Sequence, residues 1–287
     1  MNIQTTNFID EMILGLPAIH NQHARTTDAY ASYAKVLRSE IEPLFKDVST
    51  ERKSFGPFGK IAFPYFNMGN KNSLDLFDLD EFIIFSFYWI NRNRYKRVLD
   101  IGANIGLHSL ILSKCGYQIE SFEPDPFHFE QLKYVMQIND VKNVTPHCAA
   151  VSCKSGQAEF VRVLGNTTSS HLAGCKNPYG ELERFSVPLF NIQDLIGKAD
   201  LIKMDVEGHE NEILLATKGS DWDSIDAIVE IGSADKAKLI YEHLNKERVH
   251  LFSQKINWQK ATKLEDIPTS YKEGSLFISK KQKMPWS

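Results

Sequence analysis

An apolar run that ends in an acid and leads into a glycine-bearing turn constrains the fold of this chain more than any other feature. The run is Val98-Leu99-Asp100-Ile101, and Gly102-Ala103-Asn104-Ile105-Gly106 follows before a helical pattern begins. Further along, a second apolar run ends in Phe122-Glu123-Pro124. Strand, tight turn, helix and second strand form the unit from which an α/β sheet builds a pocket for a nucleoside ligand.

The rest of the chain continues this alternation of apolar runs and helical patterns. We predict strands over residues 61–66, 97–101, 117–122, 144–151, 201–204, 227–231, 249–252 and 275–279. We predict helices over residues 79–92, 106–115, 126–139, 210–218 and 236–245. Near-continuous apolar strands between helices predict a mostly parallel sheet covered on both faces, with its ligand beyond the carboxyl ends of the strands.

Two regions depart from the alternation. Residues 1–60 are predicted to be a helical N-terminal extension: Tyr30, Tyr33, Ala34, Val36 and Leu37 follow helical spacing, which Pro43 and the 56–59 turn interrupt. Residues 61–287 are predicted to form a Rossmann-like domain. It contains a hairpin insertion near 152–197, with strands over 158–163 and 184–189 and a polar tip over 165–171.

The turn after the predicted strand over 97–101 indicates which cofactor the protein binds. Nicotinamide-binding folds carry G-x-G-x-x-G, whereas the corresponding positions here are Gly102, Asn104 and Leu107, which disfavours a diphosphate ligand. Asp100 is placed to accept hydrogen bonds from an ammonium group, directly or through water, and Glu123 from both hydroxyls of a ribose. An ammonium and a ribose without phosphate describe S-adenosylmethionine. An NAD-linked oxidoreductase and a non-catalytic binding protein that retains the fold stay open as alternatives.

Three segments together resemble the FkbM family of S-adenosylmethionine-dependent methyltransferases: 100–106, 122–124 and Lys203-Met204-Asp205-Val206-Glu207-Gly208-His209-Glu210. The resemblance implies a class I methyltransferase fold, with a seven-stranded sheet whose last strand is antiparallel, and O-methylation of a sugar or natural product. It also implies the cofactor-binding residues, which are Asp100, Gly102, Ala103, Asn104, Gly106, Glu123, Pro124, Ala149 and Asp205. Cys153 departs from the family pattern, which usually has an acid there.

The segment 203–210 supplies the candidate catalytic residues. Lys203 and Asp205 point to the same face of their strand, and Lys203 needs a partner there, which could be Asp100, Asp205 or Glu230. A base assists attack by a hydroxyl, and we favour Asp205, with Glu207 and His209 as further candidates. Glu210 is expected to stabilise a helix N-terminus. Asp205, Glu207 and Glu230 could also hold Mg²⁺, but we favour acid–base catalysis without a metal.

The acceptor is predicted to be a small hydroxylated molecule, such as a sugar or glycoconjugate, bound by Thr168, Ser169, Ser170, His171 and Glu230. A net charge of −3 provides no basic field for nucleic acid. The apolar run over 82–90 is too short to span a bilayer. The four cysteines form no CxxC pair and are expected to be reduced thiols in a cytosolic protein. A homo-oligomer stays open.

Overall fold

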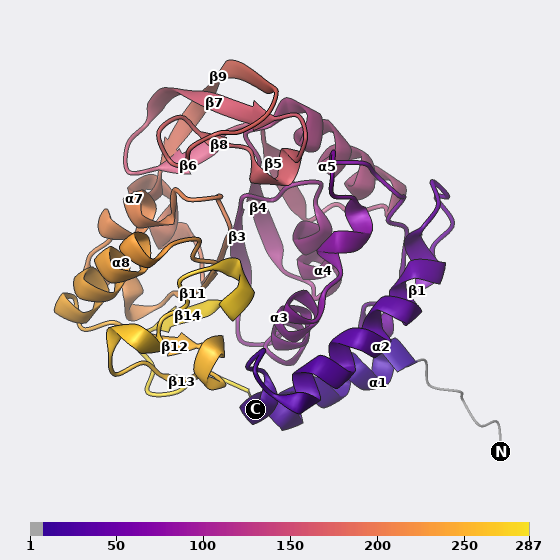
Figure 1. Cartoon of the computed structure of the whole chain (residues 1–287), viewed down its shortest axis with the longest axis horizontal. Coiled ribbons are helices and arrows are strands. Elements are labelled where there is room, and N and C mark those ends of the chain that lie inside the picture. Colours follow the sequence, from indigo (N-terminus) through magenta and orange to yellow (C-terminus); the bar gives the residue numbers. More distant parts are fainter. Residues whose placement is uncertain (1–7, 287) are drawn as a thin grey trace.

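A mixed eight-stranded sheet forms the centre of residues 8–286, the part of the chain that the computed structural model describes (Figure 1). In spatial order its strands are β13 (Gln259–Lys260), β12 (His250–Ser253), β14 (Leu276–Ser279), β11 (Asp226–Val229), β10 (Leu201–Met204), β3 (Arg97–Ile101), β4 (Gln118–Phe122) and β5 (Val144–His147). The strands from β11 to β5 are parallel, whereas β14 is antiparallel to both its neighbours. The expected number of seven is wrong by one, because β13 folds back onto β12 as an edge strand.

Helices cover both faces of this sheet. One face packs against α3 (Leu79–Ile90), α4 (Leu107–Lys114) and α5 (Pro126–Ile138), and the other against α6 (Ile192–Leu195), α7 (Glu210–Leu215) and α8 (Ala234–Lys246). Alternate residues of one strand serve the two cores: Val98 belongs to the first and Leu99 to the second, as the period of a strand requires. Asp100 and Lys203 therefore point to the same face as Val98 and Leu201.

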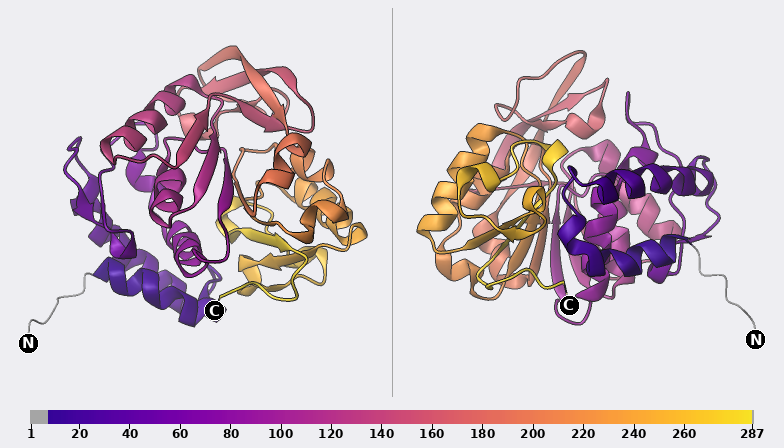
Figure 2. Two further views of the ribbon diagram at one scale, coloured as in Figure 1. Left: turned by 180° about the vertical axis from the view of Figure 1, so that it is seen from behind. Right: turned by 60° about the horizontal axis from the view of Figure 1, so that its bottom comes forward.

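The first helices lie outside α3 (Figure 2). They are α1 (Phe8–Gly15) and α2 (Asp28–Phe45), with the 3-10 helix η1 (Leu16–Gln22) between them. The predicted apolar stripe is corrected: α2 buries Leu37, Ile41 and Phe45, while Tyr33 and Val36 are exposed. Pro43 does not interrupt α2, since the buried face continues to Phe45. Residues 1–7 of the predicted extension lie outside the described residues.

Two predicted strands have different bounds in the structure. The strand expected over 61–66 is reduced to β2 (Lys60–Ile61), which pairs with β1 (Lys53–Ser54). The strand expected over 144–151 is two strands, because the chain leaves the large sheet after His147. β5 pairs with β4, whereas β6 (Ala150–Ser152) pairs with β9 (Leu182–Asn191) in a second sheet.

The second sheet has the order β6, β9, β7 (Gly156–Val163) and β8 (His171–Leu172). It lies above the large sheet in the view of Figure 1. β7 and β9 form the expected antiparallel pair, but their connection is longer than the predicted tip. It contains the 3-10 helix η4 (Thr167–Ser169), then β8, and then a loop over 173–181. This connection reaches the carboxyl ends of the large sheet and forms one wall of the site. Across the part of the chain described, no helix is both long and apolar enough to cross a bilayer.

Candidate active site

A cavity of about 720 Å³ lies at the carboxyl ends of β3, β4, β10 and β11, within the usual size of small-molecule sites. Residues just after these four strands line it, namely Gly102, Glu123, Asp205 and Glu230. Parallel strands present their carboxyl ends at one edge of the sheet, which brings these residues together although they are distant in sequence.

Gly102 allows two of these strand ends to approach each other. Its φ is +79°, and a Cβ at this position would lie 1.7 Å from the carbonyl oxygen of Asp205. No side chain fits there, so the turn after β3 and the turn after β10 pack backbone against backbone. The glycine that the motif places here is therefore needed for the closure of the cavity.

Glu123 is held in the cavity wall by two backbone amides. Its Oε2 accepts a hydrogen bond from the Asn104 N–H at 2.8 Å, and its Oε1 accepts one from the Asp125 N–H at 2.8 Å. Burial raises the pKa of Glu123 to about 8. Together with Pro124, which also lines the cavity, these contacts fix the acid at the end of β4.

Asp100 lies behind the cavity wall. It is fully buried, it is absent from the lining, and its Oδ2 accepts a hydrogen bond from the Ser109 hydroxyl at 2.6 Å. The carboxylate predicted to accept hydrogen bonds from an ammonium group, directly or through water, thus lies outside the lining of the cavity. Ala103, Gly106 and Ala149 also lie outside the lining, because they pack into the cores or turns around it.

Lys203 occupies the wall in front of Asp100. Its Nζ lies 3.7 Å from Asp100 Oδ1 and donates to the Gly102 carbonyl at 3.1 Å. Of the three partners considered for Lys203, the structure selects Asp100. Burial by itself would lower the pKa of Lys203, but the carboxylates of Asp100 and Asp205 raise it above the usual lysine value.

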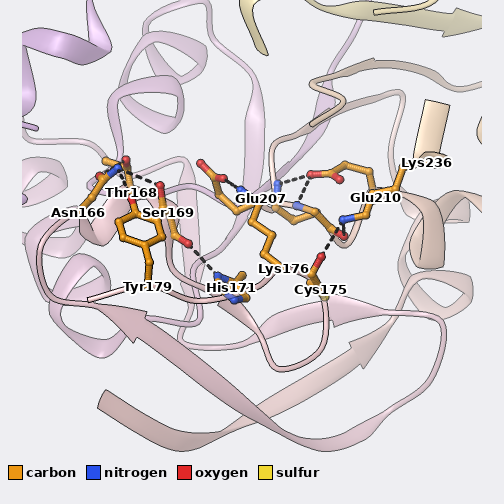
Figure 3. Close-up of polar contacts among 12 residues, drawn as sticks. Asn166, Thr168, Ser169, His171, Cys175, Lys176, Tyr179, Glu207, Glu210 and Lys236 are labelled. Carbon is orange, nitrogen blue, oxygen red and sulfur yellow. Dashed lines mark hydrogen bonds and ion pairs between the residues drawn. The ribbon is translucent and has the colours of Figure 1, made fainter. Parts of the chain in front are cut away.

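The turn after β10 brings Asp205, Glu207 and His209 into the lining. Glu207 has a φ of +53° and forms an ion pair with Lys176 of the β8–β9 loop (Figure 3). Burial and the charge of Asp205 raise the pKa of Glu207 to about 7.

His209 is already engaged on both ring nitrogens. Its Nε2 lies 2.9 Å from the Ser152 hydroxyl, and its Nδ1 lies 3.2 Å from the Cys175 sulfur. Burial lowers the pKa of His209. The ring thus connects the turn after β10 to the second sheet.

The predicted acceptor residues divide into two groups. Thr168, Ser169, Ser170 and Glu230 line the cavity, whereas His171 lies behind it with its Nδ1 2.8 Å from the Ser169 carbonyl oxygen. Burial, followed by the neighbouring charges of Asp205 and Glu207, raises the pKa of Glu230 well above the usual value. A carboxylate cluster and a hydroxyl cluster thus line the same cavity.

The sequence did not identify several lining residues, which are Arg25, Asp78, Asp80, Glu81, Asn166, Lys176, Tyr179 and Tyr271. Arg25 pairs with Asp80 and lies 3.6 Å from Asp78, so the N-terminal segment contributes to the wall through α3. Lys176 and Tyr179 come from the loop that the prediction treated as a short hairpin tip. Only long-range packing brings these residues to the cavity. Within residues 8–286, no group of three or more His, Cys, Asp or Glu side chains is placed to hold a metal ion.

The order of the parallel strands, the lining acids after β4, β10 and β11, and the match to a methyltransferase domain define the class of protein: an S-adenosylmethionine-dependent methyltransferase. The chain belongs to the FkbM methyltransferase family, since the methyltransferase FkbM domain matches residues 100–254, more than half of its length.

The relatives found are distant. "Methyltransferase 1" of Beauveria bassiana (strain ARSEF 2860) is 24% identical over 155 residues, which cover 46% of this chain and 62% of that protein. The chain thus matches less than two thirds of this relative's length. Among solved structures, a precorrin-6y C5,15-methyltransferase from Geobacter metallireducens GS-15 is 13% identical, with coverage of 66% and 82% and a TM-score of 0.36. A SAM-dependent methyltransferase from Agrobacterium tumefaciens is 9% identical, with coverage of 70% and 62% and a TM-score of 0.39.

Proposed function

We propose that this enzyme transfers the methyl group of S-adenosylmethionine to a hydroxyl group of a small, sugar-like acceptor. One observation carries the proposal: Glu123 at the end of β4 and the acids after β10 line the same cavity as Thr168 and Ser169. One side offers acceptors for a ribose and a cationic centre, and the other offers side chains that hydrogen-bond to hydroxyls.

The residues present fit this cofactor. Glu123 would accept hydrogen bonds from the ribose hydroxyls, and the turn at Gly102 and Asn104 would lie along the rest of the nucleoside end. Lys203 and Asp205 would lie beside the amino-acid end, with Asp100 acting from behind Lys203. When bound, S-adenosylmethionine supplies a methyl group on a cationic sulfur. An oxygen nucleophile attacks the methyl carbon in line with the carbon–sulfur bond, and the neutral thioether leaves.

An acid after β10 would act as the base that removes the proton from the acceptor hydroxyl. A base is most useful when its pKa lies near the working pH, and Glu207, with a pKa raised to about 7, meets this condition. Asp205 lies two residues away and also lines the cavity, so either carboxylate could take the hydroxyl proton. We infer that Glu207 takes this proton, with Lys176 as its counter-ion.

The hydroxyl-rich wall supports a sugar-like acceptor. Thr168 donates a hydrogen bond to the Asn166 side-chain oxygen at 2.7 Å, and the Asn166 amide donates to the Ser169 hydroxyl at 2.9 Å. Tyr179, whose side chain is largely exposed, also lines this wall. Such a network of hydroxyl and amide groups beside an aromatic ring is suited to a polyhydroxylated ring.

The proposal includes an organisation in which residues 1–60 are an N-terminal extension to a methyltransferase domain with an insertion near 152–197. Arg25, which lines the cavity beside Asp78 and Asp80, supports a role of the extension in the cavity wall. The four cysteines are free thiols, which supports a reducing compartment.

Methyl transfer is tested with S-adenosylmethionine labelled in its methyl group and a panel of monosaccharides, disaccharides and glycosides. We expect labelled product with at least one acceptor, and a loss of about 10²–10⁴-fold in kcat for Glu207→Gln. Glu242→Gln, on the exposed surface of α8, is the matched control and should retain full activity. Labelling of anionic or apolar acceptors in place of sugars would overturn the acceptor class.

A further inference from the structure

Glu210, which begins α7, makes its hydrogen bonds to the turn that precedes the helix. Its Oε1 accepts from the Gly208 N–H at 2.9 Å and from the Val206 N–H at 3.3 Å (Figure 3). The side chain is 2% exposed and lies in the cavity wall. These two amides flank Glu207, so one carboxylate oxygen spans the residue that carries the proposed base.

The turn over residues 206–208 has an unfavourable backbone conformation. Glu207 has a φ of +53° and Gly208 a φ of +106°, and a left-handed glutamate is unfavourable unless its surroundings compensate. The Lys236 ammonium donates to the Gly208 carbonyl and to the Cys175 carbonyl. Glu210 and Lys236 therefore hold the amides and the carbonyl of one short turn.

The hydrogen bonds of Glu210 differ from those of an acid that only caps a helix. Both of its hydrogen bonds go to amides that precede α7, a helix of only six residues. Its second oxygen, Oε2, is buried and has no hydrogen-bond partner among residues 8–286. Burial of a carboxylate is costly, so its presence requires a compensating contribution elsewhere.

We propose that Glu210 is a positioning residue: it fixes the backbone of residues 206–208 so that the Asp205 and Glu207 carboxylates face the cavity. This inference rests on the proposed function, because it concerns the same site. It adds a second role to the expectation that Glu210 stabilises a helix N-terminus.

The test compares Glu210→Ala with Glu210→Gln, which keeps an acceptor oxygen at the same place. Amide hydrogen exchange of the 204–210 peptide is followed by mass spectrometry, and the affinity for S-adenosylhomocysteine is measured by calorimetry. For Glu210→Ala we expect exchange at Val206 and Gly208 to rise by about tenfold, and the affinity to fall by at least about fivefold. Glu210→Gln should restore both values. Glu212→Ala, an exposed acid on the same helix, should change neither.

Wild-type exchange and wild-type affinity in Glu210→Ala would overturn the proposal, and so would faster exchange with unchanged affinity. A Glu210→Gln variant that behaves like Glu210→Ala would also overturn it, since the role would then depend on charge and not on the shared acceptor oxygen. If Glu210→Ala does not fold, Glu210→Asp replaces it, and wild-type values in that variant count against the proposal. Failure of the wild-type protein to bind S-adenosylhomocysteine would instead remove the proposed function, while the exchange data would still judge the hydrogen bonds.

Discussion

Lys203 lies directly opposite Asp100 in the register between β10 and β3, with its ammonium nitrogen 3.7 Å from Asp100 Oδ1. Lys203 faces the cavity and Asp100 does not. The acid of the first motif therefore lies behind a lysine, and under the proposed function the amino-acid end of the cofactor would meet Lys203 first. The cross-strand neighbour Ser121 and the helical Ser109 complete this buried group, with their hydroxyls 2.7 Å apart.

Lys203→Met should lower the free energy of unfolding by about 3–5 kcal/mol, because it leaves the Asp100 carboxylate buried without its counter-ion. The double variant Asp100→Asn/Lys203→Met should recover most of this loss, since no charge then remains buried. Urea unfolding at neutral pH measures both values. Lys198→Met, at an exposed position just before β10, is the control and should stay within about 0.5 kcal/mol of wild type. A single variant as stable as wild type would show that the pair does not behave as a buried ion pair.

Glu123 should make stability fall as pH rises. The folded protein holds this proton up to a pKa of about 8, whereas the group's ordinary pKa of 4.5 applies to the unfolded chain. Between these values the folded state binds more protons, so the contribution of Glu123 to the free energy of unfolding decreases with increasing pH. The free energy of unfolding of Glu123→Gln should therefore rise relative to that of wild type between about pH 5 and about pH 8, as measured by urea unfolding. Glu242→Gln, at an exposed position of α8, should run parallel to wild type; a parallel curve for Glu123→Gln would contradict the expectation.

Gly102→Ala should disrupt the site more than an equivalent change at another left-handed glycine. Its new Cβ would meet the Asp205 carbonyl at 1.7 Å, so the backbone of one turn must move. Gly116 has a similar φ of +86°, but a Cβ there would meet nothing within 4 Å. Gly116→Ala should therefore lower the free energy of unfolding by only about 1–2 kcal/mol, the strain of a left-handed alanine. Gly102→Ala should lower it further and weaken S-adenosylhomocysteine binding. Thermal unfolding and calorimetry provide the comparison, and equal losses in the two variants would refute the close packing of the two turns.

Lys176→Met should move the acidic limb of the pH–rate profile upward. The Lys176 ammonium stabilises the ionised form of Glu207 and so lowers its pKa, which burial and Asp205 raise to about 7. Without this lysine the pKa of Glu207 rises further, and we expect the limb to shift by about one pH unit, with lower activity at neutral pH. Lys154→Met, at an exposed position, is the control. An unshifted limb would assign the base to a residue other than Glu207.

The sequence could predict those parts of the fold that depend on one continuous pattern. The bounds of β3 and β10 agree with their prediction, because each is an apolar run between polar flanks. The strand predicted over 144–151 is two strands, because the chain changes sheets after Pro146 and His147, and the apolar residues on both sides of them do not indicate which sheet each joins. The local pattern predicts an interruption at Pro43, but α2 continues past it to the buried Phe45.

The residues of the candidate site also fall into those that a local pattern predicts and those that depend on long-range packing. Glu123 and Asp205 could be predicted because each follows a recognisable strand at the ligand-binding edge of the sheet. The position of Asp100 behind Lys203 could not, since it depends on the register of two strands that are distant in sequence. Arg25 and Lys176 reach the cavity from a helical segment and a loop, and neither has a local pattern that indicates a ligand.

The most direct test of the account is a crystal structure of the protein with S-adenosylhomocysteine. We predict both ribose hydroxyls at hydrogen-bond distance from the Glu123 carboxyl group, about 2.5–3.0 Å, and the amino-acid end beside Lys203 and Asp205. A ligand bound in this cavity without a contact to Glu123, or bound outside the carboxyl edge of the sheet, would contradict it.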